Sequence, residues 1–314
     1  MDASGVYVAG YTNSTLPGQT SSGGQDAFVR KYDPVGNELW TRQFGSAGGD
    51  YSYGITVAAS GVYVAGYTQD TLPGQTSSGG ADAFVRKYDL AGNEVWTRQF
   101  GSAIADIATG ITVDASGVYV IGETDGTLPG QTGSGSKDAF VRKYDLAGNE
   151  VWTRQFGSAT NDFASGVSID ASGVYVAGHT YGTLPGQTSS GDQDAYIRKY
   201  DLAGNVLWTR QFGSVAAEWA LGVSVDTSGV YVAGFTVGSL PGQTSSGGVD
   251  GFVRMYDLAG NELWTYQFGT GSGTYLNGVS IDASGVYVAG QTYGNLPGQT
   301  SSGGLDAFIM KLVK

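Results

Sequence analysis

One unit of 56 residues repeats through the whole chain, and this repeat limits the possible folds more than any other feature. The string Gly-Val-Tyr-Val begins at residues 5, 61, 117, 173, 229 and 285. No insertion or deletion interrupts the spacing, and residues 57–112 and 113–168 agree at 42 of 56 positions. A period of 20 to 50 residues or a little more is typical of solenoids and propellers. The units are 1–56, 57–112, 113–168, 169–224, 225–280 and the partial 281–314.

Each unit contains four short segments that are rich in Val, Tyr, Phe, Trp and Thr, the residues that favour a pleated sheet. In the second unit we expect strands A to D at 54–57, 62–67, 83–88 and 94–100. The A–B and C–D connections are short and contain Asp, Gly and Asn, as hairpin turns do. No segment has apolar residues at helical spacing over a helical length, so the sequence predicts an all-β chain.

A four-stranded antiparallel unit of this length is typical of a β-propeller blade, and stacking such blades would bury both faces of each sheet. The chain begins at strand B and ends at strand C, which gives 22 strands and incomplete first and last blades. We expect one propeller domain over residues 1–314, with six blades. A five-bladed ring is the alternative, in which strand D of the first unit (39–44) completes the last sheet. A linear β-solenoid is the rival architecture.

Several strings of the unit resemble the bacterial SBBP β-propeller repeat family. They are Gly-Val-Tyr-Val-Ala-Gly-Tyr-Thr, Leu-Pro-Gly-Gln, Asp-Ala-Phe-Val-Arg-Lys-Tyr-Asp and Gly-Asn-Glu-Val-Trp-Thr-Arg-Gln-Phe-Gly. The resemblance covers essentially the whole chain. It implies a propeller from a large secreted or surface protein of bacteria, and it implies no catalytic activity. The family name suggests seven blades, from which this chain departs.

The composition excludes several kinds of function. The chain has no Cys, one His and a net charge of −12, so thiolate chemistry, a His-rich zinc site and binding to a nucleic-acid backbone are not expected. The sequence contains no run of 18 apolar residues that could span a membrane, and its first residues do not show the pattern of a signal peptide. Because the chain starts within the pattern, we expect a fragment of a longer protein or a designed chain. No catalytic motif is present, so we expect no enzyme.

One face of the sheets is the best candidate for a binding surface. Antiparallel connectivity puts the B–C and D–A loops on one face, which we call the loop face, and the short turns on the other. The D–A segment differs most between units, for example at 47–53, 103–109 and 159–165. Positions that the fold requires should repeat, so a recognition surface is expected where the copies differ, unless that variation is drift.

Some residues of the loop face are candidates for ligand contact. An acidic column in the D–A loop is expected to face the axial mouth and suggests cation binding, with calcium possible; its members are Asp50, Asp106, Asp162 and Glu218. Exposed rings of the same face, which could stack on sugars, are Trp219, Tyr181 and Tyr293. The alternative, which we favour, is that each acid is solvated or caps its own Gly-containing loop. His179, at a variable position, is expected at the surface or half-buried, without a catalytic role.

Two columns that repeat in the units are interpreted as structural. The strand-D tryptophans are Trp40, Trp96, Trp152, Trp208 and Trp264. The aspartates that precede strand C are expected to accept backbone N–H bonds from the Gly-rich loop; they are Asp26, Asp82, Asp138, Asp194, Asp250 and Asp306.

The sequence therefore predicts a non-enzymatic propeller that serves as an interaction or structural module, extracellular or on a bacterial surface, without a cofactor. A protein or glycan partner is expected on the loop face. The alternatives are a multivalent glycan-binding propeller and a cation-binding propeller. Self-association through open sheet edges is also expected.

Overall fold

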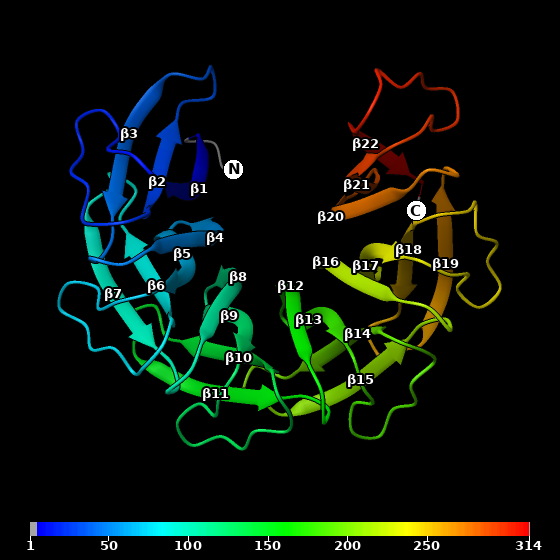
Figure 1. The fold of residues 1–314 in the computed structure, drawn as a ribbon, viewed down its shortest axis with the longest axis horizontal. Coiled ribbons are helices and arrows are strands. Elements are labelled where there is room, and N and C mark those ends of the chain that lie inside the picture. Colours follow the sequence, from blue (N-terminus) through cyan, green and yellow to red (C-terminus); the bar gives the residue numbers. More distant parts are fainter. Residues whose placement is uncertain (1–4, 314) are drawn as a thin grey trace. The chain divides into compact units, whose positions relative to one another are not determined.

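The structure is a computed structural model, and it describes residues 5–313. The chain divides into two compact units, residues 1–156 and 157–314. Figure 1 shows that the described part consists of strands joined by loops and turns. Among residues 5–313 there is no helix, so none is long and apolar enough to cross a membrane. The prediction of an all-β chain is confirmed, whereas the single domain stays a prediction.

The first unit contains three antiparallel sheets. The first sheet comprises β1 (Val6–Thr12), β2 (Asp26–Tyr32) and β3 (Glu38–Phe44). The second comprises β4 (Asp50–Ala58), β5 (Gly61–Thr68), β6 (Asp82–Tyr88) and β7 (Glu94–Phe100). The third comprises β8 (Asp106–Asp114), β9 (Gly117–Thr124), β10 (Asp138–Tyr144) and β11 (Glu150–Phe156).

The second unit also contains three antiparallel sheets. The fourth sheet comprises β12 (Asp162–Asp170), β13 (Gly173–Thr180), β14 (Asp194–Tyr200) and β15 (Val206–Phe212). The fifth comprises β16 (Glu218–Asp226), β17 (Gly229–Thr236), β18 (Asp250–Tyr256) and β19 (Glu262–Gly269). The sixth comprises β20 (Thr274–Asp282), β21 (Gly285–Thr292) and β22 (Asp306–Leu312).

The strand order within the described sheets follows the chain, with four sheets of four strands between two sheets of three. These repeated sheets are consistent with a propeller, and the expected 22 strands are all present in residues 5–313. Within the first sheet, β3 pairs with β2. The number of blades in a ring stays a prediction.

Strand A is longer than the sequence predicted, because its first half lies in the variable segment. β4 begins at Asp50 rather than at Gly54, and its register shifts at a bulge between Ser52 and Gly54. The same shift occurs in the other four strands at this position. A bulge bends a strand and breaks its alternation, which is why the segment resembled a loop. The observed D–A loop is therefore only about half as long as the sequence predicted.

Aromatic rings of strand D pack against strand C of the next sheet within each unit. Phe100 meets Phe140 edge to face, with ring centroids 5.7 Å apart, and the guanidinium of Arg142 lies 4.0 Å from the Phe100 centroid. Arg142 also pairs with Glu150 across the two outer strands of its own sheet at 3.4 Å. Edge-to-face and cation–π contacts of this kind add to the area that the rings bury.

The strand-D tryptophans connect neighbouring sheets, as their repetition suggested. Trp40 Nε1 donates to Leu90 O at 3.3 Å, and Arg42 Nε donates to Gly92 O at 2.6 Å. Gly92 has φ +84°, and a Cβ there would lie 2.8 Å from the Trp40 ring, so glycine is required at this turn. On the opposite side of strand D, Val95 is 52% exposed near the start of the strand, whereas Thr97 is buried. The expectation that stacking buries both faces is therefore wrong only for the start of this outer strand.

Candidate functional site: an aromatic row on the loop face

In the second to sixth sheets, the start of strand A and the end of strand B lie next to each other at the loop face. The second residue of strand A lies opposite the seventh residue of strand B, as in the pairs Phe163–His179 and Trp219–Phe235. These two positions vary between units, although their neighbours in strand B repeat. Rings occupy most of them, and the rings form a row in each compact unit.

In the second unit the row is built on stacked rings. The imidazole of His179 lies between Phe163, at 4.6 Å and 9°, and Trp219, at 4.3 Å and 8°. Trp219 also contacts Phe235 at 5.2 Å, and Phe235 meets Tyr275 edge to face at 5.0 Å. The separations of 4.6, 5.2 and 5.0 Å lie in the range of about 4.5–7 Å that aromatic pairs favour, and the His179–Trp219 separation of 4.3 Å is slightly shorter. The row therefore extends along β12, β13, β16, β17 and β20.

In the first unit the same positions hold tyrosines. Tyr51 stacks on Tyr67 with centroids 4.7 Å apart, and it meets Tyr11 at 4.8 Å. Tyr53 lies 5.8 Å from Tyr67 and is 52% exposed. Burial raises the pKa of the Tyr67 hydroxyl, with nearby tyrosine hydroxyls adding to the shift. The Tyr67 phenol therefore stays neutral over the physiological range and can donate a hydrogen bond.

The third sheet, also in the first unit, has no rings at the two positions and carries a charged cluster there. Ile107 and Glu123 occupy the two ring positions. Lys137 Nζ contacts Glu123 at 2.7 Å and Asp125 at 3.1 Å, and the paired acids raise the pKa of Lys137 against the effect of its burial. The loop face thus presents both rings and a half-buried ion-pair cluster at positions that differ between copies.

Trp219 and the two predicted tyrosines have different surroundings. Trp219 is the second residue of β16, half-buried, with its Nε1 donating to Gln193 Oε1 at 2.5 Å. It was expected in an exposed loop, and this placement is wrong because strand A begins earlier. One face of its ring is covered by His179. Tyr181 and Tyr293 follow strand B and are 40% and 51% exposed, so the expectation that they are accessible is confirmed.

The acidic column is buried rather than exposed. Each member of the column is the first residue of a strand A, and none of them has accessible surface; they are Asp50, Asp106, Asp162 and Glu218. Each accepts the backbone N–H of a serine four residues earlier, for example Ser102 on Asp106 at 2.5 Å. Their expected position at an open mouth is therefore wrong, because they close the D–A loop from inside.

Two rows of acids approach each other at a glycine. A Cβ on Gly101 would lie 2.2 Å from Asp82 Oδ1 and 2.6 Å from Asp106 Oδ2. Burial raises the pKa of Asp106, and the charge of Asp82 raises it further. Asp82 Oδ2 accepts the Ser78 N–H at 2.8 Å, which confirms the structural role predicted for this column. In residues 5–313 no group of three or more His, Cys, Asp or Glu side chains could hold a metal ion.

His179 is the only histidine of the chain, and it is buried, with 5% of its surface accessible. Its Nδ1 has no hydrogen-bond partner, and burial lowers the pKa of the imidazole to about 4. The expectation of a surface or half-buried histidine is wrong. The recurrence of Tyr51, Phe163, Trp219 and Tyr275 at one position of the repeat is the sequence signal that could have revealed the row.

Comparison with known proteins gives distant relatives. No family model matches the chain, so membership of the SBBP family stays a prediction. The regulatory protein FlaEY of Caulobacter vibrioides is 28% identical over 98% of this chain and 37% of its own length. An uncharacterized WD repeat-containing protein, L264 of Acanthamoeba polyphaga mimivirus, is 21% identical over 86% of this chain and 26% of its own length. The chain thus spans well under half of either relative.

Solved structures also resemble the chain, at low scores. A putative 6-phosphogluconolactonase of Bacteroides uniformis has a TM-score of 0.46 and 10% identity, over 97% of this chain and 81% of that chain. The WD40 β-propeller domain of Doa1 has a TM-score of 0.40 and 11% identity, over 96% of each chain. At these scores the likenesses assign neither a fold nor an activity. The sheets and the aromatic row define an all-β repeat protein, consistent with a propeller, with a varied loop face.

Proposed function

We propose that this chain is a non-enzymatic β-propeller interaction module that binds its partner on the loop face. The observation that carries the proposal is the distribution of differences between the copies. The residues that hold the sheets together repeat, whereas the loop face gathers a Trp, a His, several Tyr and a charged cluster at variable positions. Tyr and Trp are enriched at protein interfaces, and a charged pair beside them adds selectivity.

The relatives give limited support to this function. One is described as a regulatory protein and the other as a WD repeat-containing protein, and neither description is that of an enzyme. The resemblance to SBBP repeats is the basis for proposing a bacterial surface or secreted location. Catalysis would need different residues with different roles gathered at one place. The one histidine instead lies inside a ring stack, between Phe163 and Trp219.

Glycan binding is the second candidate, and the exposed tyrosines favour it. Tyr181 and Tyr293 lie at the same position of two units, so equivalent shallow sites could act together. The rings inside the row cannot stack on a sugar with a face that another ring covers. Sugar contact would therefore fall to the exposed tyrosines rather than to Trp219.

A binding screen tests the function and separates the two ligand classes. The chain is probed against a glycan array and against a displayed library of random peptides. Selected peptides without glycans support the interaction module, whereas glycan binding that is lost in Tyr181→Ala/Tyr293→Ala supports the lectin alternative. If neither screen yields a binder, the result contradicts both the interaction module and the lectin alternative.

A further inference from the structure

Four tyrosines gather on the loop face of the first two sheets, and we call them the tyrosine cluster; they are Tyr11, Tyr51, Tyr53 and Tyr67. Tyr53 lies at the bulge of strand A, and among the five described strands A only β4 has a ring there. The residues at this position of the other four are Thr109, Ser165, Leu221 and Asn277. Tyr11 and Tyr53 are 50% and 52% exposed, and the other two tyrosines are half-buried. The cluster therefore presents supported rings to solvent.

Oxygen atoms gather around these rings. Burial raises the pKa of the Tyr67 hydroxyl, and the other three tyrosines raise it further, because ionised phenols so close together would repel each other. Tyr51 Oη donates to Gln25 Oε1 at 3.0 Å. A Cβ on Gly49 would lie 2.8 Å from Gln69 Oε1 and 3.0 Å from Gln25 Oε1, so two amide oxygens approach the cluster at one point. Rings and oxygens grouped in this way favour a hydrogen-bond donor that carries positive charge.

An exposed carboxylate lies beside the same point. Asp70 follows Gln69 in the chain, and a Cβ on Gly48 would lie 3.2 Å from the Asp70 Cβ. Asp70 Oδ1 accepts the Thr71 N–H at 2.7 Å. Within residues 5–156 no Lys or Arg pairs with this carboxylate. Asp70 is therefore available as the counter-charge for a cation that contacts the cluster.

The cations of this chain cover its repeated rings but not the tyrosine cluster. The Arg98 guanidinium lies 5.6 Å from the Trp96 centroid, and its Nε donates to Gly148 O at 2.7 Å. Over the part of the first unit that the structure describes, no Lys or Arg lies over a ring of the cluster. The B–C and D–A loops of residues 5–156 contain one Lys or Arg, which is Lys137, and it is paired with two acids. A cation over these tyrosines must therefore come from a ligand.

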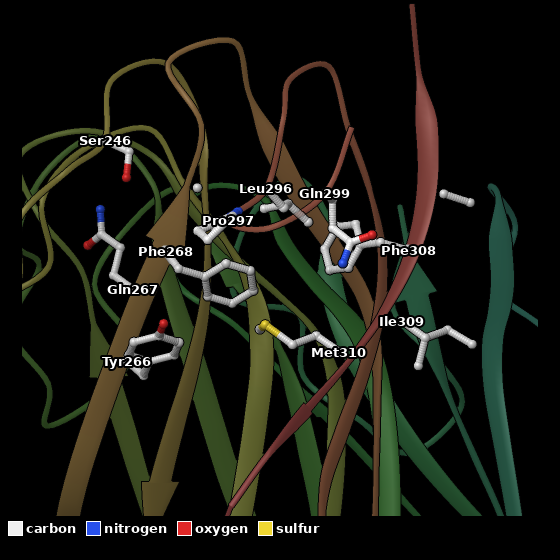
Figure 2. Close-up of a pocket in the computed structure, with 12 residues that line it drawn as sticks. Ser246, Tyr266, Gln267, Phe268, Leu296, Pro297, Gln299, Phe308, Ile309 and Met310 are labelled. Atoms are coloured by element: carbon white, nitrogen blue, oxygen red, sulfur yellow. The ribbon is translucent and has the colours of Figure 1, made fainter. Parts of the chain in front are cut away.

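A pocket of about 660 Å³ between β19 and β22 has a different chemistry. Figure 2 shows Phe268 and Met310 on its walls, and none of its 12 lining residues is charged. It suits an apolar group. The tyrosine cluster instead combines rings with a carboxylate, which is the combination that recognises a guanidinium, because this planar cation stacks on a ring and donates to an acid.

We propose that the tyrosine cluster binds an arginine side chain of a partner polypeptide, with Asp70 as its counter-charge. A guanidinium has five N–H donors in one plane, so it can lie on a tyrosine ring while it donates to Asp70 and to Gln69 Oε1. Arg98 makes the same kind of contact with Trp96 inside the chain. A lysine ammonium has no planar face to stack. This inference rests on the proposed binding function of the loop face, and it names the chemistry of the partner.

Three labelled peptides test the ligand class by fluorescence anisotropy with the full chain, at about 50 mM salt so that charge is weakly screened. They are four repeats of Arg-Gly-Ser, of Lys-Gly-Ser and of citrulline-Gly-Ser, and citrulline keeps the planar shape without the charge. We expect the citrulline peptide to bind about tenfold more weakly than the arginine peptide, and the lysine peptide about threefold more weakly. Equal binding of the arginine and citrulline peptides, a lysine peptide that binds at least as tightly, or no binding of the arginine peptide at about 1 mM would overturn the proposal.

Two matched pairs of variants locate the arginine peptide on the cluster. Tyr53→Leu should weaken binding about fourfold, whereas Tyr53→Phe, which keeps the ring face, should leave it unchanged. Leu221 occupies this position in the fifth sheet, so the strand accommodates leucine. Asp70→Asn should weaken binding about threefold. Asp192→Asn removes the same charge from an exposed loop position of the fourth sheet and should leave the affinity unchanged.

Equal effects within either pair of variants would overturn the arginine site. The loop-face function is tested separately by the peptide screen. A selected peptide that lacks arginine, and that loses affinity in Tyr181→Ala/Tyr293→Ala but not in Tyr53→Leu, would support the loop-face function and overturn this inference.

Discussion

The indole of Trp219 lies parallel to the imidazole of His179, with ring centroids 4.3 Å apart and 8° between the planes. β16 and β13 hold these rings, so the contact joins two neighbouring sheets of the second unit. Neither ring repeats in the other units. This pair occurs once in a repeating chain and lies on its most varied face. It therefore makes the loop face of these two sheets different from the loop face of the other sheets.

His179→Phe should make the stability of the protein less sensitive to acid. The folded pKa of His179, about 4, lies below its ordinary value of 6.5. The unfolded chain therefore binds the proton first, and stability is lost as the pH falls from about 6.5 towards 4. The wild type should lose about 2 kcal/mol more than the variant between pH 7.5 and pH 5. Urea unfolding at both pH values measures this, and equal losses would show that His179 is accessible to protons when folded.

Asp106→Asn should remove part of an opposite pH dependence. Burial raises the folded pKa of Asp106 above that of the unfolded chain. The group therefore contributes stability that is present at low pH and is lost as the pH rises through its folded pKa. The variant should melt at a higher temperature than the wild type at pH 7.5, and the gain should shrink as the pH falls. A variant that melts lower at pH 7.5 would mean that the ionised carboxylate is stabilised by its serine donors.

Gly101→Ala should destabilise the second and third sheets. The new Cβ would lie within 2.6 Å of oxygens of both Asp82 and Asp106. Overpacking of this kind costs about 1–3 kcal/mol. Gly278→Ala is the matched control, since a Cβ there meets nothing within 4 Å and should leave the melting temperature unchanged. If the two variants melt alike, the acids are not held at the glycine.

Gln99→Leu should show how much the strand-D glutamine contributes to the stability of a four-stranded sheet. The change leaves the Leu72 N–H without its acceptor and removes a donor from Asp82. A buried polar group left unpaired costs about 1–3 kcal/mol. Chemical denaturation measures the loss. A change within about 0.5 kcal/mol, as at ordinary surface positions, would show that solvent replaces the glutamine.

The sequence predicted the strands and their order because the repeat displays each alternating segment up to six times. The structural roles of Trp96 and Asp82 followed from the same repetition. The start of strand A at Asp50 was missed because the bulge at Ser52 and Gly54 disturbs the alternation there. That error moved Asp106 and Trp219 from strand to loop, and so from the interior to the surface. The burial of His179 depends on rings from two other strands, β12 and β16, which no single segment of sequence displays.

The most direct test of the loop-face function is the affinity of a selected ligand for three forms of the chain. The forms are the wild type, Tyr181→Ala/Tyr293→Ala on the loop face, and Leu207→Ala at the exposed start of β15. Calorimetry with the best glycan or peptide from the screen gives each dissociation constant. We predict a loss of about tenfold or more for the tyrosine variant and no change for Leu207→Ala. Unchanged binding by the tyrosine variant, with loss in Leu207→Ala, would contradict the account.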